Sequence, residues 1–501
     1  MFGKVLISIA AIFLFLNFGF AQHGSQVAAE DHSRVSAIGE SIPVHLTDAA
    51  ATEFRKAPYA IYFGTNTEFK IFWQLYTTRV CTLRWGTTTS YSDGEATTTE
   101  YGNSHQHAYL ITGLTPATKY YYQVTAGTSQ FSGSFVTAPP DNADSVKFLA
   151  YGDNRSYPDK HDLVAEKIIA LIDSSPGYQT IILNVGDLIY DGDSESDWDD
   201  EIFNPHYTNI QKVLSTLGYQ VARGNHEGEG TLFKKYFPYP HVADFYWSFD
   251  YGPAHFAVID QYSDYSVGSD QYNWLDHDLN ATGKKWKFIV LHKPGWSAGG
   301  HSNSTDVQEI IQPLCEKYGV QIVFGGHNHY YSRAVVNGVM HITTGGGGAP
   351  LYEPDPSYPN IVATSESYHF CKINIQGNHL AFSAVSTGGA EIDSFFITLK
   401  PSGIADVSLP DGFALEQNYP NPFNPVTTIR YTIPSNIRHA RMTTLTVYDQ
   451  LGRVVAVPVH EKQKAGQYAL RFDASHLASG VYYYVLKSGN FADRKKMLLI
   501  R

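Results

Sequence analysis

The spacing of apolar residues divides the chain into three regions. Between about Tyr59 and Thr137, short runs alternate apolar and polar residues and are separated by turn residues, which predicts the antiparallel strands of a β-sandwich. From about residue 145 to Leu399, continuous apolar runs alternate with stretches of helical period, which predicts an α/β domain. From about residue 412 the alternating pattern returns and predicts a second β-sandwich.

Two stretches of the central region have the 3–4 spacing of an amphipathic helix. The first, residues 162–175, is expected to place Leu163, Ile168, Leu171 and Ile172 near one buried face. The second, residues 305–319, has five spaced apolar residues (Val307, Ile310, Ile311, Leu314 and Tyr318), and Pro313 is expected to kink it.

The segments outside these regions predict a leader and two linkers. Residues 1–21 combine Lys4 with an apolar run that is short for a membrane span and with small residues before Gln22, which predicts a secretory signal peptide rather than an uncleaved anchor. An extended lead-in is expected at 22–55, and linkers rich in Pro, Asp or Ser are expected at 138–145 and 400–411. The sequence predicts no membrane span in the mature chain.

Charge and cysteine content limit the possible partners. The formal net charge is −12 and no basic stripe is evident, so nucleic acid is not expected as a partner. Three cysteines are too few for a disulfide framework. A Cys315–Cys371 bridge and free buried thiols both remain open.

Polar side chains follow five apolar runs of the central region. They are Asp153 after "VKFLAYG", Asp187 after "TIILNVG", Asn225 and His226 after "YQVARG", His292 after "WKFIVL", and His327 and His329 after "VQIVFGG". Ligands bind beyond the carboxyl ends of the strands in α/β sheets, so we expect these groups to converge at one rim if the strands pair in one sheet. The glycines would let the backbone turn sharply there.

Imidazole, carboxylate and amide groups together suit Zn, Fe or Mn. One carboxylate has two oxygens and can bridge two ions, and a phenolate from Tyr190 would favour ferric iron. Each residue alone has an ordinary structural explanation, since Asp and Asn commonly close turns. Their coincidence at strand ends favours a centre of two metal ions.

These blocks, in this order, resemble the calcineurin-like metallophosphoesterases: Gly-Asp, Gly-Asp-x-x-Tyr, Gly-Asn-His-Glu, Val-x-His and Gly-His-x-His-x-Tyr. Tyr190 and "GLTPATKYYYQV" at 113–124, which resembles a fibronectin type III domain, make the chain similar to purple acid phosphatases over about residues 56–399. The resemblance implies an α/β core of β-sheets flanked by helices (145–399) behind a fibronectin type III-like sandwich (56–138).

The resemblance also implies a role for each matching residue. The first metal ion would be held by Asp153, Tyr190 and His329, and the second by Asn225, His292 and His327, with Asp187 bridging them. The ions would be Fe paired with Zn, Mn or Fe. His226 and His301 would face the substrate, and Glu227 would support the site rather than react.

Arg155 departs from the family pattern, which has His or Gly two residues after the first Asp. The guanidinium could hold substrate phosphate in a bidentate contact or form an ion pair with a nearby acid. The acidic run Asp191–Asp200 does not fit a calcium loop, because Ser196 stands at the glycine position and Ile202 at the final glutamate position. We therefore expect a solvated loop near the site.

The C-terminal region carries "LEQNYPNPFNP" at 415–425, "YDQLGR" and "LASGVYYYVLKSG". Residues 412–501 resemble the type A sorting domain of bacterial type IX secretion. The resemblance implies secretion machinery as a partner and a route through the periplasm of a Gram-negative bacterium to the surface or medium. A sandwich that packs on the chain or binds sugar is the alternative.

Together these features predict an exported phosphomonoesterase that uses metal-activated hydroxide to attack phosphorus. A phosphodiesterase with the same site is one alternative. A catalytically inactive surface binding protein on the same scaffold is the other.

Overall fold

The computed structural model describes residues 53–399, 413–418, 421–433, 440–463, 466–489 and 491–500. The expected signal peptide (1–21), nearly all of the lead-in (22–55) and the linker at 400–411 lie outside these ranges. The lead-in was expected to reach residue 55, but the first strand already begins at Phe54.

The N-terminal region is a sandwich of two antiparallel sheets. One sheet has three strands in the order β1 (Phe54–Ile61), β2 (Phe69–Leu75) and β5 (Gln106–Ile111). The other has four in the order β4 (Gly94–Thr98), β3 (Cys81–Gly86), β6 (Lys119–Ala126) and β7 (Ser129–Val136). The alternating burial of β6, with Tyr120, Tyr122 and Val124 inside, is the pattern that the sequence predicted. The specific resemblance to fibronectin type III stays a prediction.

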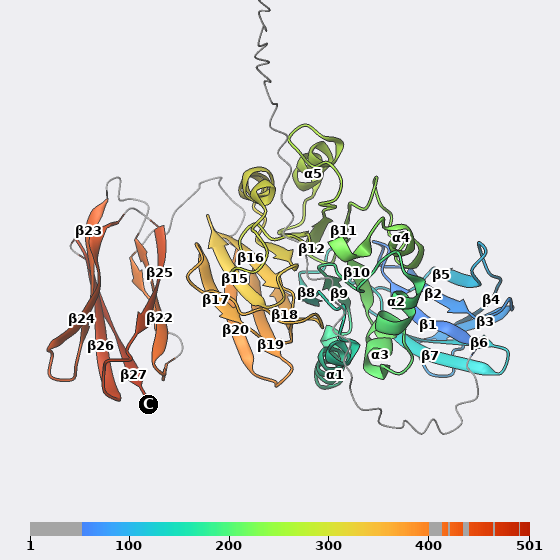
Figure 1. Cartoon of the computed structure of the whole chain (residues 1–501), viewed down its shortest axis with the longest axis horizontal. Coiled ribbons are helices and arrows are strands. Elements are labelled where there is room, and N and C mark those ends of the chain that lie inside the picture. The colour runs from blue at the N-terminus through green and yellow to red at the C-terminus, as the bar shows by residue number, and fades with distance from the viewer. Residues whose placement is uncertain are drawn as a thin grey trace, which may run out of the picture. The chain divides into compact units, whose positions relative to one another are not determined.

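The central region confirms the predicted core of β-sheets flanked by helices (Figure 1). Its first sheet has the order β10 (Gly218–Val221), β9 (Ile181–Asn184), β8 (Ser145–Tyr151), β18 (His369–Gln376), β19 (His379–Ser386) and β20 (Glu391–Thr398). Its second sheet has the order β11 (Trp247–Tyr251), β12 (Ala254–Val258), β13 (Trp286–Val290), β14 (Ile322–Gly325), β16 (Val339–Thr344), β15 (Tyr331–Val336) and β17 (Ile361–Ser365).

Aromatic side chains join the inner faces of these two sheets. The ring of Phe148 on β8 makes edge contacts with Phe256, Phe288 and Phe324 of the second sheet at centroid distances of 5.1, 5.4 and 6.4 Å. Because successive strand residues point to opposite faces, Ala257 next to Phe256 packs on the outer side instead. Burial of such large rings is the main stabilising contribution of the core.

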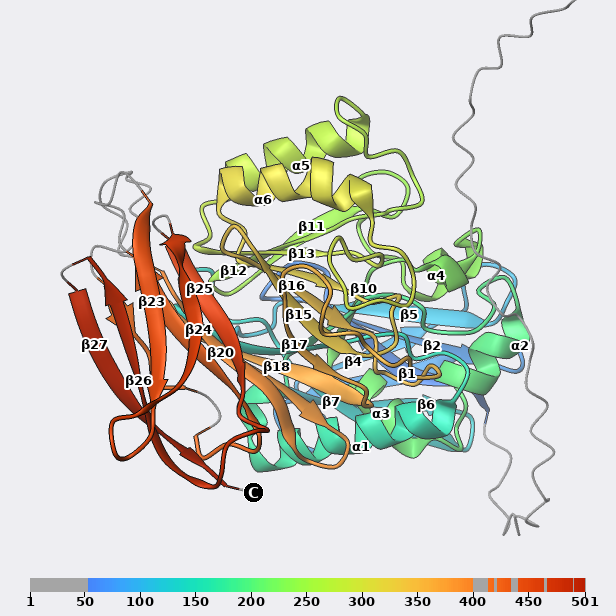
Figure 2. The same ribbon diagram turned by 60° about the vertical axis from the view of Figure 1, so that its left-hand side comes forward.

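Helices cover the outer faces of both sheets, giving four layers. Figure 2 shows α5 (Asp270–Ala281) and α6 (Gln312–Tyr318) side by side over the second sheet, with α1 (Pro158–Ser174) and α3 (Thr208–Thr216) on the opposite side of the sandwich. The shorter helical segments are η1 (Pro176–Tyr178), α2 (Glu195–Asp197), η2 (Trp198–Ile202), η3 (Asn225–Glu227), α4 (Thr231–Tyr236) and η4 (Val307–Ile311).

The two predicted helices form, with differences in detail. The buried face of α1 consists of Val164, Ala165, Ile168, Ile169 and Ile172. The expectation for Leu163 was wrong, since its side chain is 43 % exposed. The second helix is a π-turn, η4, that passes into α6 immediately before Pro313, because proline lacks the N–H that a regular turn requires.

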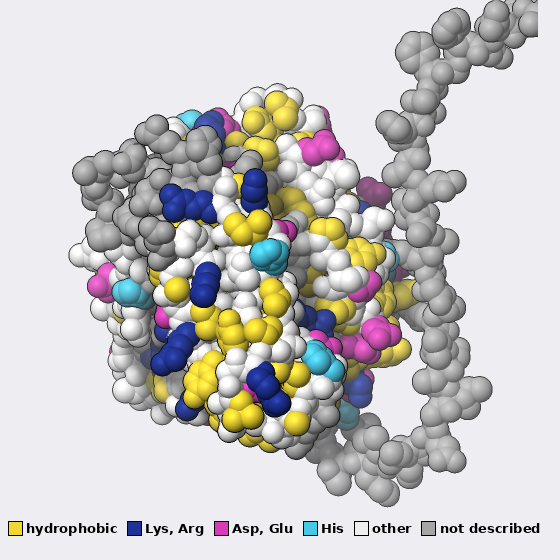
Figure 3. Space-filling view, turned by 90° about the vertical axis from the view of Figure 1, so that its left-hand side faces the viewer, with side chains coloured by type: hydrophobic (Ala, Val, Ile, Leu, Met, Phe, Trp, Pro, Cys, Tyr) yellow, Lys and Arg dark blue, Asp and Glu magenta, His cyan; other side chains and the backbone are white. Residues whose placement is uncertain are grey.

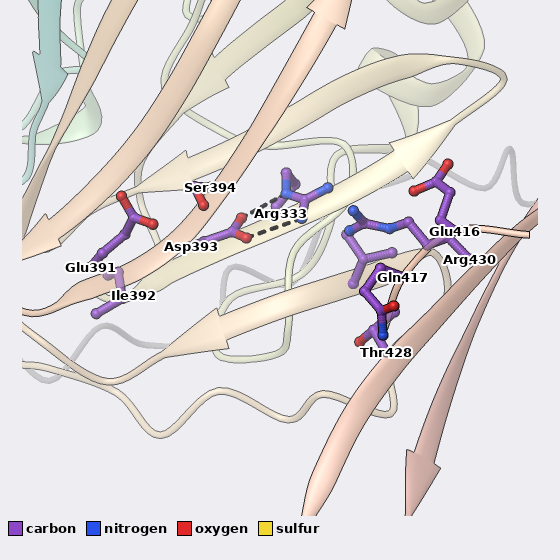
Figure 4. A pocket seen from close by; sticks show the side chains of 10 residues that line it. Arg333, Glu391, Ile392, Asp393, Ser394, Glu416, Gln417, Thr428 and Arg430 are labelled. Atoms are coloured by element: carbon purple, nitrogen blue, oxygen red, sulfur yellow. Dashed lines mark hydrogen bonds and ion pairs between the residues drawn. The ribbon is translucent and has the colours of Figure 1, made fainter. Parts of the chain in front are cut away.

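A buried ion pair also ties the two central sheets together. Arg333 on β15 donates from Nε and Nη2 to the carboxylate of Asp393 on β20, at 2.6 and 3.0 Å (Figure 4). Tyr331 donates its hydroxyl to the same carboxylate at 2.7 Å. A bidentate guanidinium–carboxylate contact fixes orientation as well as distance, so this pair sets how β15 lies against β20.

The acidic run after Asp191 is partly helical rather than the solvated loop that we expected. It forms α2 and η2, and its carboxylates bind basic residues of the neighbouring sandwich. Asp199 accepts from Arg55 at 2.6 Å and from the fully buried ammonium of Lys56. A buried ammonium requires such a partner, and the pair joins β1 to the central region.

The C-terminal region is a sandwich with its own core. One sheet has three strands in the order β21 (Ala414–Leu415), β22 (Val426–Ile433) and β25 (Gly466–Asp473). The other has four in the order β24 (Val454–Gln463), β23 (Arg441–Tyr448), β26 (Gly480–Ser488) and β27 (Phe491–Leu499). On the face of the molecule in Figure 3, Lys and Arg side chains are scattered among hydrophobic and uncharged ones.

Within the described ranges, none of the helices combines the length and the apolarity needed to cross a bilayer. Cys315 and Cys371 are both free and buried, so of the two alternatives the structure has free thiols.

A histidine held by two carboxylates generates a prediction about stability. His255 on β12 contacts Asp250 and Asp278, each at 2.8 Å, and joins β11 to α5. Burial acts to lower its pKa, but the two carboxylates raise the pKa to about 9. The imidazolium therefore stabilises the fold below the unfolded-state pKa of about 6.5, and this contribution is lost as the pH rises through about 9.

We expect His255→Gln to lower the free energy of unfolding by about 3 kcal/mol at pH 6 and by much less at pH 10.5. Urea denaturation at both pH values measures this, with His206→Gln at an exposed histidine as the control. An equal loss at both pH values would contradict the charged contact.

Candidate metal centre

The predicted site residues lie in loops at the carboxyl ends of parallel strands. Asp153 follows β8, Asp187 follows β9, Asn225 follows β10, His292 follows β13, and the pair His327 and His329 follows β14. These strands belong to two sheets, so the condition of a single sheet, under which we expected one rim, is not met. The rim still forms, because the inner faces of the sheets pack together and bring both sets of strand ends to one edge.

Three of these residues have an unusual backbone conformation. Asp153, Asp187 and His327 have φ angles of 55°, 56° and 64°. Residues with a side chain seldom adopt positive φ, and each case costs about 1–3 kcal/mol. Hydrogen bonds hold the strained loops against one another: the N–H of Asp153 donates to Gly186 O at 2.9 Å, and the N–H of His327 donates to the Asp153 carboxylate at 2.9 Å.

This contact explains the glycine that precedes His327. A Cβ atom on Gly326 would lie 2.2 Å from Oδ2 of Asp153, which is far inside contact distance. Gly345 is excluded from carrying a side chain in the same way, because its Cβ would meet Asn328 O at 2.3 Å and Asp153 Oδ2 at 2.9 Å. The run 345–348 is thus a buried wall of the site.

The second cluster, made by the residues expected to hold the second metal ion, forms around Nε2 of His292. Within 3.0–3.4 Å of this atom lie Asn225 Oδ1, His327 Nδ1 and Asp187 Oδ1. The Nδ1–H of His292 donates to the carbonyl of Val185 at 2.8 Å, so Nε2 of the neutral ring carries a lone pair. Electron pairs from several groups therefore converge here, an arrangement that a bound cation stabilises.

The first cluster, made by residues expected to hold the first metal ion, lies on the other side of the Asp187 carboxylate. Asp153 Oδ1 is 3.7 Å from Nε2 of His329, and donor atoms of Asp153, Asp187 and His329 lie within 4.8 Å of one another. His329 donates Nδ1–H to Pro350 O at 2.7 Å, which again directs the Nε2 lone pair into the site. Asp187 belongs to both clusters, so its two oxygens can serve two ions.

Burial keeps the histidines neutral, as metal ligation requires. It lowers the pKa of His292 and His327, and it lowers the pKa of His329 to about 3, with help from Arg155. Burial also raises the pKa of Asp153, and Asp187 adds to this effect. Burial also acts to raise the pKa of Asp187, but the charges of His292, His226 and Arg155 together hold this pKa below its ordinary value.

Glu227 is fully buried beneath the site. Its carboxylate accepts from the N–H groups of Gly224, Asp187 and Leu188 at 2.5, 3.1 and 2.7 Å. Burial raises its pKa to about 7, and the charge of Asp187 contributes. Glu227 therefore fixes the strained loop of Asp187 from behind.

The residues expected to face substrate lie at the edge of the clusters. His226 Nε2 is 4.0 Å from Asp187 Oδ2, and its Nδ1–H donates to Tyr190 O at 2.5 Å. The ring of Tyr190 lies 5.7 Å from that of His226. His301 stacks on His327 at 4.2 Å, held by its N–H to Asn328 Oδ1 at 2.7 Å.

Arg155, for which two contacts were left open, points into the first cluster. Its Nε lies 3.5 Å from Asp187 Oδ2 and its Nη2 lies 3.5 Å from His329 Nε2. The acid it approaches is thus the shared carboxylate, not the neighbouring Asp191.

Two tyrosines near the centre were missed by the sequence analysis. Tyr352 stacks on His329 at 4.3 Å and lies 3.4 Å from His301 Nε2. Tyr262 donates to Asn225 Oδ1 at 3.5 Å. Neither tyrosine follows one of the five apolar runs, so the pattern that identified the other residues did not include them. The available signals were the position of Tyr262 shortly after β12 and that of Tyr352 shortly after the glycine run.

Comparisons with known proteins bear on this centre. The family model described as "Calcineurin-like phosphoesterase" matches residues 147–331, and the one described as "Secretion system C-terminal sorting domain" matches residues 417–500. A "Probable inactive purple acid phosphatase 1" of Arabidopsis thaliana is 29 % identical over 267 residues, covering 43 % of each chain. The "Fe(3+)-Zn(2+) purple acid phosphatase 12" of the same plant is 26 % identical over 306 residues, covering 52 % of this chain and 64 % of the relative.

This chain therefore spans roughly two fifths to two thirds of the length of those curated relatives. A solved purple acid phosphatase from yellow lupin seeds aligns with 69 % of this chain and 75 % of its own, at a TM-score of 0.57 and 20 % identity, which shows a shared fold. Residues 147–331 therefore form a calcineurin-like phosphoesterase domain, purple acid phosphatases are among the relatives of the chain, and residues 417–500 form a secretion-system sorting domain.

Proposed function

We propose that the chain is an exported phosphoesterase that hydrolyses phosphomonoesters at a centre of two metal ions. The observation that carries the proposal is the convergence of lone pairs on both sides of the Asp187 carboxylate. We assign Asp153, Tyr190 and His329 to the first ion, Asn225, His292 and His327 to the second, and Asp187 to both. The purple acid phosphatase relative named for Fe(3+) and Zn(2+) supports iron with zinc as the pair.

When bound, two cations neutralise the charge of a phosphate ester and make water a stronger nucleophile. The residues of the chain orient the donor atoms and supply the proton for the leaving group. His292 and His329 each donate Nδ1–H to a backbone carbonyl, which orients their Nε2 atoms toward the centre before substrate binds. The carboxylate of Asp187 lies between these two donor atoms. His226, fixed by its contact with Tyr190 O, directs Nε2 toward the site and donates a proton to the leaving oxygen.

Metal removal tests the centre itself. We expect a chelator to abolish hydrolysis of an aryl phosphomonoester and added Zn²⁺ or iron to restore it, with up to two ions per chain by elemental analysis at metal excess. A visible charge-transfer band that is lost in Tyr190→Phe would place Tyr190 on ferric iron. Fewer than one ion per chain even at metal excess would favour the inactive binding protein.

The same preparation separates the enzymatic alternatives. Turnover of an aryl phosphomonoester should exceed that of the corresponding phosphodiester. The reverse ranking would replace the monoesterase by a diesterase that uses the same residues.

His226→Ala tests the proton donor. We expect this variant to keep its bound metal and to lose about 10²–10⁴-fold in kcat, because it removes general acid catalysis and no assigned ligand. His379→Ala, at an exposed histidine on β19, is the matched control. Full activity in His226→Ala would remove His226 from the mechanism.

Export is the second part of the proposal. We assign residues 412–501 as the sorting signal, residues 1–21 as the signal peptide, and residues 56–138 and 145–399 as the units that function after export. Deletion of 412–501 is expected to leave phosphatase activity in the cell fraction instead of at the surface or in the medium. Unchanged export after the deletion would argue for a sandwich with a binding role.

A further inference from the structure

The guanidinium of Arg155 lies among the donor atoms of the first cluster. Its side chain is only 12 % exposed, and its Nε is 3.5 Å from Asp187 Oδ2. On the other side, Nη2 lies 3.5 Å from Nε2 of His329. Arg155 thus approaches two of the atoms that we assign to the first metal ion.

A guanidinium in this position competes with a metal ion. It is always charged and carries only N–H donors, so it interacts with the same lone pairs that a cation needs. The Nε2 lone pair of His329 cannot accept from Arg155 and bind a metal at the same time. A metal ion would also repel the fixed positive charge at this short range.

The second cluster differs in this respect. Nε2 of His292 faces the oxygens of Asn225 and Asp187 and a nitrogen of His327, which are all groups that a cation attracts. The two positions in one centre are therefore unequal, and the difference lies on the Arg155 side.

We propose that Arg155 makes loading of the first metal position depend on a bound phosphate group. This inference rests on the proposed metal centre. With no anion present, the guanidinium weakens metal binding at Asp153 and His329, while the Asn225–His292–His327 position fills normally. A phosphate group draws the flexible side chain away into a bidentate contact, which frees the donor atoms. Because such coupling is reciprocal, phosphate and the first metal ion strengthen each other's binding.

Calorimetric titration of the metal-free full chain with Zn²⁺ tests the proposal. We expect two unequal binding phases in the unaltered protein, and His329→Ala should remove the weaker one. Arg155→Met, which keeps the length of the side chain without its charge, should tighten the weaker phase by about tenfold and leave the tighter phase unchanged. Arg155→Lys keeps a charge but lacks the bidentate contact, so it should retain the unequal phases.

Inorganic phosphate provides the second arm of the experiment. It should tighten the weaker phase of the unaltered protein about tenfold and have little effect in Arg155→Met. Equal phases in the unaltered protein, or a weaker phase that neither Arg155→Met nor phosphate changes, would overturn the role of Arg155 while leaving the metal centre intact. Absence of any Zn²⁺ binding in all variants would instead overturn the proposed function.

Discussion

The carboxylate of Asp187 is the element on which the rest of the site depends. It is buried, it belongs to both donor clusters, and it lies on a loop held in a left-handed backbone conformation. A buried carboxylate is costly unless positive charge or hydrogen-bond donors surround it. Here Arg155 and the backbone N–H of His226 meet that need, and Glu227 binds the backbone of the same loop from below.

The scaffold supports this arrangement through the packing of its two sheets. Edge contacts of Phe148 with Phe256 and Phe288 close the sandwich, and the Arg333–Asp393 pair fixes the orientation of the neighbouring strands. With the sheets held rigidly, loops from five strands can meet to within hydrogen-bond distances. The packing of the sheets and the hydrogen bonds between the loops offset the strain of positive φ at Asp153, Asp187 and His327. Such strain is common where a site must be organised before its ligand binds.

The Arg155 contact shows how one side chain can alter a shared centre. The relatives of this domain include one named a probable inactive purple acid phosphatase and one named a Fe(3+)-Zn(2+) purple acid phosphatase, so similarity to these proteins does not by itself decide activity. In this chain the donor atoms are present on both sides of Asp187, and the guanidinium of Arg155 lies 3.5 Å from Asp187 Oδ2 and from His329 Nε2 on one of them. The relative affinity of these donor atoms for Arg155 and for a metal ion is a property of this chain's own residues.

The sequence alone determined the class of the core, the order of the donor residues and the four donor loops that begin with glycine, because these follow from local periodicity and local turn chemistry. The residues of both donor clusters are among the ligands that it predicted, and their role as ligands stays a prediction. It assigned the wrong burial to Leu163 and expected a loop at the acidic run, since those outcomes depend on which neighbours pack there. Only the tertiary structure decided that two sheets rather than one form the rim, that Tyr262 and Tyr352 reach the centre, and that Arg155 points at Asp187. These contacts join segments far apart in the chain, and a local pattern carries no information about which distant side chains will share one space.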